Sequence, residues 1–106
     1  SDPRVQAALR WIRQHYTVKE NPFMGTDGLY YYYHTMAKTL AVVGDRVVVD
    51  ARGRRHRWAI ELSDELIRRQ GRDGAWVNSN RRWREDDKDL VTCYAVLALA
   101  YCEQGL

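Results

Sequence analysis

A histidine and a cysteine are the side chains of this sequence best suited to bind a metal ion. His34 ends a run of four tyrosines, and Cys93 lies in a later apolar segment. A catalytic zinc site needs three protein ligands and one open position, and the sequence offers at most these two. We therefore expect His34 to be a hydrogen-bonded pocket histidine and expect no cofactor, with zinc at His34 and Cys93 as the alternative.

The tyrosines around His34 form a second group of interest. At helical spacing, Tyr30, Tyr33 and His34 share one face, while Tyr32 and Met36 share another. Aromatic rings suit a carbocation or an isoprenoid chain through their quadrupole and their apolar surface. The alternative is that the rings fill a wide gap between helices. The candidates for lining an apolar cavity are Tyr30, Tyr33, His34, Met36, Cys93 and Tyr94.

Two charged stretches admit a functional and a structural interpretation. Asp86-Asp87-Lys88-Asp89 is acidic, but carboxylates there suit the positive end of a helix better than a catalytic role. Arginines gather between Arg52 and Arg57 and between Arg81 and Arg84, where they could hold an anion such as pyrophosphate. We expect exposed, solvated loops instead. No nucleic-acid partner is expected, because no recognition motif accompanies the charge.

Hydrophobic periodicity predicts an all-α protein that would position these residues. One amphipathic helix begins at Asp2-Pro3 and ends near Tyr16. A second helix, apolar on nearly every face, covers about 28–43 and stops at Gly44-Asp45. A short hairpin or extended loop fits 46–57. An amphipathic helix from Trp58 to about Gln70 and another apolar helix, beginning after Glu85-Asp86-Asp87, complete the chain.

Length and composition restrict the class of protein. The chain has 106 residues, 45% hydrophobic and 29% charged, with a formal net charge of +3. These values fit one small globular domain, or part of a larger one, and exclude collagen and wholesale disorder. No apolar run approaches the ~20 residues of a membrane span. Cys93 and Cys102 would lie ~13 Å apart on opposite helix faces, so we expect small buried thiols in a reducing cytoplasm.

The sequence repeats itself at a period of about 46 residues. Asp27-Gly28-Leu29-Tyr30 corresponds to Asp73-Gly74-Ala75-Trp76. Each unit is an outer amphipathic helix, a loop and an inner apolar helix. This divides the chain into repeat 1 (about 1–45), a linker or hairpin (46–57) and repeat 2 (about 58–106). Two hairpins cannot wrap helices that are apolar on all sides, so we expect further repeats or identical copies around them.

One segment resembles the QW motif of the terpene cyclase and protein prenyltransferase superfamily. That motif places an aliphatic residue, a glutamine and Gly-x-Trp in order, and the matching residues here are Leu66, Gln70, Gly74 and Trp76. Glu65 stands where the family has an aromatic residue. Trp11, Tyr16 and Tyr30 belong to a decayed first copy. The whole chain resembles bacterial prenyltransferase/squalene-oxidase repeat proteins, in the block Gly28–Lys38 above all.

The resemblance implies an α/α toroid, in which six hairpins surround an apolar cavity. This chain would supply two hairpins, as a C-terminal-like fragment, and its start at Ser1-Asp2 indicates a trimmed or excised piece. Three copies could close a ring, so self-association is expected, with a trimer as one form. The QW residues would be scaffold: Gln70 would bond backbone at the helix end, and Trp76 would pack.

The resemblance also limits the chemistry. Squalene cyclases use Asp-x-Asp-Asp as a proton donor, which 86–89 does not match, and the catalytic residues therefore remain unknown. Tyr33-His34-Thr35 stands in the register of a zinc-binding Tyr-His-Thr of the prenyltransferases, but Val91 stands where Asp would precede Cys93. We expect part of an isoprenoid-handling protein, an isomerase or prenyltransferase if an enzyme at all. The alternative is a non-catalytic repeat module that binds protein or lipid, or that self-assembles.

Overall fold

Helices account for most of the regular structure in the computed structural model, which describes residues 2–106. The elements in chain order are α1 (Pro3–Gln14), α2 (Leu29–Val43), β1 (Val47–Val49), β2 (Arg55–Arg57), α3 (Trp58–Arg69), a 3-10 turn η1 (Arg82–Arg84) and α4 (Lys88–Gly105). The all-α prediction is therefore correct in outline, with a small two-stranded sheet added. In the described part of the chain, no helix is long and apolar enough to span a membrane.

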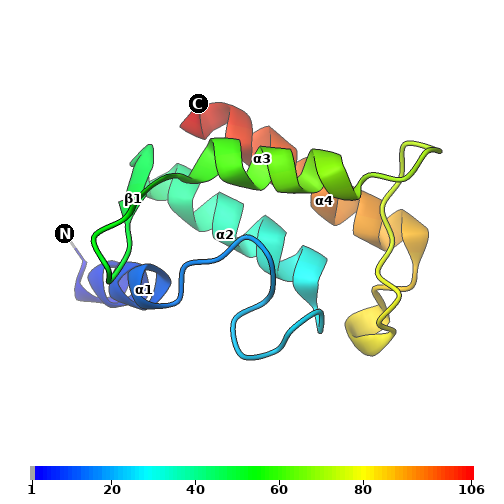
Figure 1. Cartoon of the computed structure of the whole chain (residues 1–106), viewed down its shortest axis with the longest axis horizontal. Helices are drawn as coiled ribbons and strands as arrows, with labels where there is room; N and C mark the ends of the chain where they lie inside the picture. Colours follow the sequence, from blue (N-terminus) through cyan, green and yellow to red (C-terminus); the bar gives the residue numbers. More distant parts are fainter. Residues whose placement is uncertain (1) are drawn as a thin grey trace.

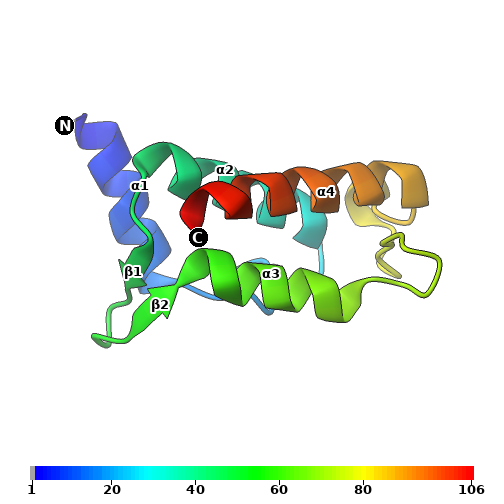
Figure 2. The same cartoon turned by 90° about the horizontal axis from the view of Figure 1, so that it is seen from above.

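Most of the packing between helices involves α2, α3 and α4, which lie against one another. Figures 1 and 2 show α2 and α4 running side by side in the same direction, with α3 lying along them in the opposite direction. α1 instead crosses the C-terminal end of α2 (Figure 2). The two sequence units thus differ in geometry, because α1 does not lie along α2 as α3 lies along α4.

The segment between α2 and α3 is a β-hairpin, one of the two forms that the sequence allowed for it. β1 and β2 pair antiparallel, with Val48 opposite His56. The β-branched valines favour the extended conformation, and Gly53 occupies the turn with φ +83°, a conformation that favours glycine. β2 continues directly into α3, so the hairpin fixes where that helix begins.

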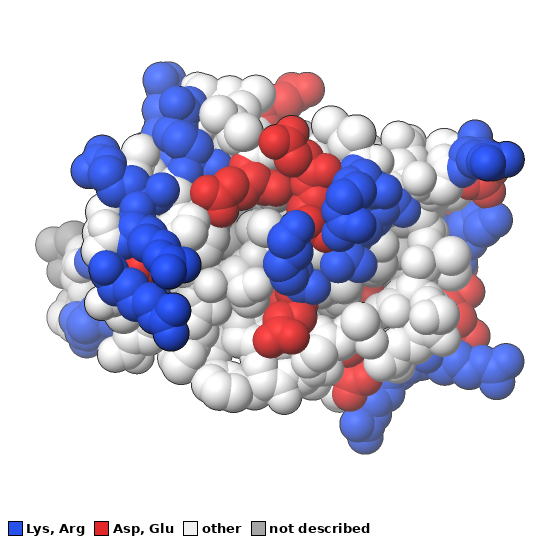
Figure 3. Space-filling view, in the orientation of Figure 1, with Lys and Arg blue, Asp and Glu red and all other residues white. Residues whose placement is uncertain are grey.

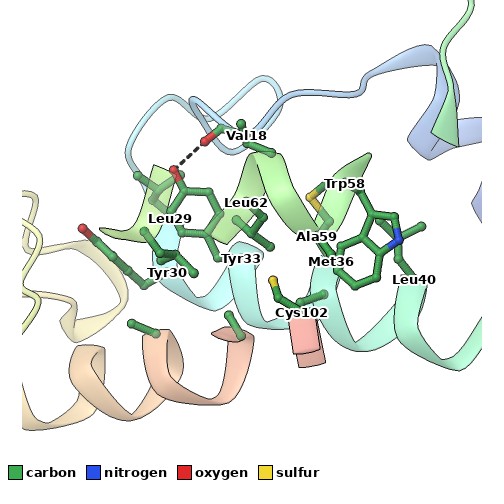
Figure 4. Close-up of a cluster of buried hydrophobic side chains, with 14 of the residues drawn as sticks. Val18, Leu29, Tyr30, Tyr33, Met36, Leu40, Trp58, Ala59, Leu62 and Cys102 are labelled. Carbon is green, nitrogen blue, oxygen red and sulfur yellow. Dashed lines mark hydrogen bonds between the residues drawn. The ribbon is translucent and has the colours of Figure 1, made fainter. Parts of the chain in front are cut away.

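The core lies where α2 meets α3 and α4 (Figure 4). Tyr33 is fully buried and its hydroxyl donates a 2.7 Å hydrogen bond to the carbonyl of Val18, which ties the loop after α1 to the core. Trp58 is fully buried at the start of α3 and donates to the carbonyl of Asp45. Gly105 lets α4 approach α3 closely, since a Cβ there would lie 2.5 Å from the Trp58 ring.

The two apolar helices differ in how far the chain covers them. α2 is exposed along one stripe, which consists of Tyr31, Thr35, Lys38 and Val42. α4 leaves a broader apolar face exposed, formed by Cys93, Val96, Leu97 and Ala100. The expectation that the chain cannot cover its own apolar helices is therefore wrong for most of α2, and it holds for α4.

The ends of α1 and the burial of the two cysteines can also be compared with the sequence predictions. Asp2 caps α1 by accepting the Arg4 N–H, as predicted, but α1 ends at Gln14 rather than near Tyr16. Both thiols are free, which agrees with the prediction that they cannot bridge. Cys102 is buried, but Cys93 is exposed, so the expectation of two buried thiols is wrong for Cys93.

Candidate functional site

A carboxylate from a distant part of the chain holds the first turn of α2. Glu85 is fully buried, and its two oxygens accept the backbone N–H groups of Tyr30 and Tyr31, both at 2.9 Å. Gly28 occupies the N-cap position of α2 and has no side chain to do this. Glu85 therefore supplies both the missing cap and the negative charge that a helix N-terminus favours.

Asn78 fastens the same loop to the start of α2. Its side-chain amide donates to the Thr26 carbonyl (2.7 Å) and to Glu85 (3.2 Å), and its backbone N–H donates to the Glu85 carbonyl (2.8 Å). These bonds place Trp83 over Gly28. A Cβ on Gly28 would lie 3.2 Å from Cδ1 of Trp83, so the close approach of the indole depends on glycine.

An apolar cavity of about 490 Å³ opens at this place. Tyr31 and Tyr94 meet edge to face across α2 and α4, with ring centroids 5.6 Å apart. The lining comes from both helices, from the loop before α2 and from η1, and consists of Asn21, Met24, Gly28, Tyr31, Trp83 and Tyr94. Rings, a thioether and one amide are the typical lining of a site for an apolar small molecule.

His34 lies behind the cavity among tyrosine rings. It stacks on Tyr94 with centroids 6.0 Å apart and planes 19° apart, and it contacts Tyr31 and Tyr101. Burial and, to a lesser degree, the positive charge of Lys38 lower the pKa of His34. Its Nδ1 is buried without a hydrogen-bond partner among the described residues. The expectation of a hydrogen-bonded histidine is therefore wrong for Nδ1, and the imidazole belongs to the aromatic wall rather than to a polar pocket.

The structure distributes the predicted cavity residues over three environments. Tyr94 lines the cavity, and His34 stands behind it. Tyr30, Tyr33 and Met36 are buried in the core, and Cys93 is exposed on α4. In residues 2–106, no three His, Cys, Asp or Glu side chains gather so as to hold a metal ion.

Five of the six cavity residues were not predicted from the sequence, namely Asn21, Met24, Gly28, Tyr31 and Trp83. Tyr31 lies three positions before His34, so the helical spacing that selected His34 could also have selected it. No local sequence pattern could have selected Trp83, because its position depends on the hydrogen bonds that Glu85 accepts from the start of α2.

The QW-like residues act as scaffold around the turn after α3. Leu66 is fully buried, and its carbonyl accepts the indole N–H of Trp76 at 2.8 Å. The amide of Gln70 donates to the carbonyl of Gly74 at 2.8 Å, as expected for a side chain that bonds the next turn. Gly74 has φ +87°, which its lack of a side chain permits.

Glu65, which departs from the motif, is buried inside an ion-pair cluster. It accepts from Lys19 at 2.7 Å and from Arg69 at 2.6 Å, and it also pairs with Arg68. Burial alone would raise its pKa, but the three cations outweigh that influence and lower the pKa of Glu65 to about 2. The carboxylate thus joins the loop after α1 to α3 and takes no part in the cavity.

The comparisons with known proteins add no relative to this picture. The chain matches no protein-family model, and searches of the curated proteins and of the solved structures also gave no match.

Proposed function

We propose that this chain is a binding unit of a terpene cyclase- or prenyltransferase-like protein, in which α2 and α4 present an aromatic wall to an apolar, isoprenoid-type ligand. The observation that carries the proposal is the cavity of about 490 Å³ lined by Tyr31, Trp83 and Tyr94. Flat rings and a thioether offer dispersion contacts and ring quadrupoles.

The helix arrangement supports the same proposal. In the toroid that the sequence resembles, inner helices run parallel to one another and outer helices run against them. α2 and α4 are parallel and α3 is antiparallel (Figure 1), so α2 and α4 take the inner role and α3 the outer role.

Binding, rather than catalysis by this chain alone, fits the cavity. Its six lining residues include no carboxylic acid that could protonate an alkene. His34 has a lowered pKa and faces rings, so it is a poor proton donor.

Farnesol, an isoprenoid alcohol, is the probe that tests this function. We expect saturable binding by equilibrium dialysis, weakened about tenfold by Trp83→Ala or Tyr94→Ala, because a ring contact contributes on the order of 1 kcal/mol beyond its area. Trp11→Ala is the matched control, since Trp11 is partly exposed on α1 and does not line the cavity. Equal binding of farnesol by the parent and by all three variants would refute the proposal.

A second candidate function, self-assembly, rests on the exposed face of α4. Val96 and Leu97 are 52% and 45% exposed in the apolar middle of α4. Exposed apolar faces of this kind mark contact sites, and three copies of a two-hairpin unit would complete six hairpins. Light scattering at micromolar concentration should report a mass above the monomer, which Leu97→Glu should abolish. A monomeric mass throughout the concentration series would exclude this candidate.

A further inference from the structure

A second cavity, of about 460 Å³, lies between the end of α1, the loop that follows it and the turn of the hairpin. Three arginines line it, Arg13, Arg52 and Arg54, and we call it the arginine cleft. Figure 3 shows basic side chains gathered over the hairpin end of this face. Among the described residues, none of the ion pairs involves these three guanidinium groups.

The hairpin turn holds two of these arginines in place through their backbone. One oxygen of Asp50 accepts the N–H groups of Arg52 and Arg54, both at 2.9 Å. The N–H of Ala51 donates to the carbonyl of Arg13 at 3.0 Å, which fixes the turn against α1. The backbone that carries the three basic residues is therefore fixed before any ligand arrives, and this lowers the entropic cost of binding.

The carboxylate of Asp50 is bonded within the hairpin and pairs with none of the three guanidinium groups. Its other oxygen is bonded to Nε2 of His56 at 2.8 Å, and Nδ1 of His56 lies 3.1 Å from Glu61. The ring of Tyr16 stacks on His56 with centroids 3.9 Å apart, and its hydroxyl donates to Glu61 at 2.8 Å. Asp50 is thus fully engaged by its own neighbours, which leaves Glu20 as the other carboxylate at the cleft.

An exposed aromatic ring stands beside the arginines. Phe23 is 80% exposed and has φ +67°, an unusual backbone conformation for a bulky residue. Its ring packs edge to face on His15, with centroids 4.8 Å apart, and both residues line the cleft. An exposed ring in a strained backbone, next to unpaired cations, is a combination typical of ligand sites.

We propose that the arginine cleft binds a small phosphate ester, with the phosphate between Arg13, Arg52 and Arg54 and the organic group against Phe23. Guanidinium groups pair with phosphate oxygens through charge-assisted, bidentate hydrogen bonds. Glu20 at the edge can accept a hydrogen bond from a hydroxyl of the ester. The site is distinct from the aromatic cavity, because the two sets of lining residues share no member, although the loop after α1 contributes Pro22 and Phe23 to the cleft and Asn21 and Met24 to the cavity.

Calorimetric titration with phenyl phosphate and with inorganic phosphate tests this proposal. We expect saturable binding of phenyl phosphate, weakened about tenfold by Arg54→Gln and further by Arg52→Gln with Arg54→Gln. Arg55→Gln is the matched control: it removes the same charge one residue away, at an exposed position that does not line the cleft. Phe23→Ala should weaken phenyl phosphate and leave inorganic phosphate unchanged.

The outcomes separate the possible sources of the phosphate. Binding to vesicles that contain phosphatidic acid, lost in the double variant, would identify a lipid headgroup; binding of phenyl phosphate without vesicle binding would identify a free ester. No saturable binding of phenyl phosphate, or an equal loss in Arg55→Gln and Arg54→Gln, overturns the proposal. Circular dichroism of each variant excludes unfolding as the cause of a loss.

Discussion

Glu85 caps the helix that begins fifty-six residues before it, because its carboxylate accepts the backbone N–H of Tyr30 at 2.9 Å in a fully buried position. The same side chain accepts from Tyr31 and from Asn78. A single carboxylate thus joins the loop that carries Trp83 to the start of α2, and the aromatic cavity depends on that link.

Replacing Glu85 should destabilise the fold more than replacing any of the acidic residues next to it. Glu85→Ala leaves one buried and one partly buried N–H group without an acceptor, and we expect a loss of about 3 kcal/mol in the free energy of unfolding. Glu85→Gln keeps one acceptor and should lose about half as much. Urea unfolding measures both, with the exposed Asp86→Ala as control, expected within about 0.5 kcal/mol of the parent. A small effect of Glu85→Ala would contradict the capping role.

His56 should make stability depend on pH on both sides of a plateau. Burial lowers its pKa, but the hydrogen bonds that its ring donates to Asp50 and Glu61 outweigh this, and the pKa is raised above the ordinary 6.5. A raised pKa means that the folded state holds the proton more tightly, so the stabilisation is complete below 6.5 and is lost as pH rises through the raised value. The pKa of Asp50 is lowered from 3.8 to about 2, chiefly by its hydrogen bond to His56, so its contribution is lost as pH falls from 3.8 towards 2.

Urea unfolding at about pH 5 and about pH 8 tests the upper limb of this profile. The parent should be less stable at the higher pH, and His56→Gln should remove that difference. His15→Gln, which changes a histidine outside the Asp50–Glu61 cluster, should retain it. A pH dependence that survives in His56→Gln would assign the effect to another group.

Gly28→Ala should displace Trp83 from the aromatic cavity. Gly28 has φ +61°, and a Cβ there would come within 3.2 Å of the indole. Gly25→Ala is a close control, since Gly25 has φ +58° and open space around it. Both variants should lose about 1 kcal/mol of stability from the left-handed backbone, but Gly28→Ala alone should shift tryptophan fluorescence and weaken farnesol binding. Identical fluorescence in the two variants would mean that Trp83 does not rest on Gly28.

Gly105→Ala should destabilise the protein although alanine is the better helix former. The added methyl group would lie 2.5 Å from Trp58 and 2.9 Å from the Cβ of Ala59. Overpacking of this kind costs about 1–3 kcal/mol, which exceeds the gain of about 1 kcal/mol in helix propensity. Thermal unfolding measures the net change, and Gln104→Ala, at an exposed neighbour, should leave the melting temperature nearly unchanged. A higher melting temperature for Gly105→Ala would show that the end of α4 moves away freely.

Local sequence patterns predicted the elements of this structure that depend on interactions between residues close together in the chain. The run Leu29–Val43 is apolar and lacks proline, so its helix follows from periodicity, and Asp87 caps α4 because carboxylates suit that position. The hairpin followed from three adjacent valines and a glycine turn. The scaffold interpretation of Gln70 and Trp76 also agrees with their bonds.

The remaining features depend on contacts between residues far apart in the chain. Glu85 caps α2 rather than α4, and no sequence pattern near position 85 indicates which helix it caps. The choice between Tyr30 and Tyr31 as the cavity residue depends on which side of α2 meets α4. The crossing angle of α1 likewise depends on where the hairpin turn fastens it, through Ala51 and Arg13.

Because α2 and α4 are parallel, the positive ends of both helix dipoles lie at the same end of the molecule. One short segment neutralises both: Glu85 serves α2, and Asp87, two residues further along, accepts from Asp89 and Leu90 in α4. Any fluctuation that lifts this segment uncovers the amides of both helices together. In hydrogen exchange, the first turns of α2 and α4 should therefore open as one cooperative unit, although fifty-nine positions separate Leu29 from Lys88 in the sequence.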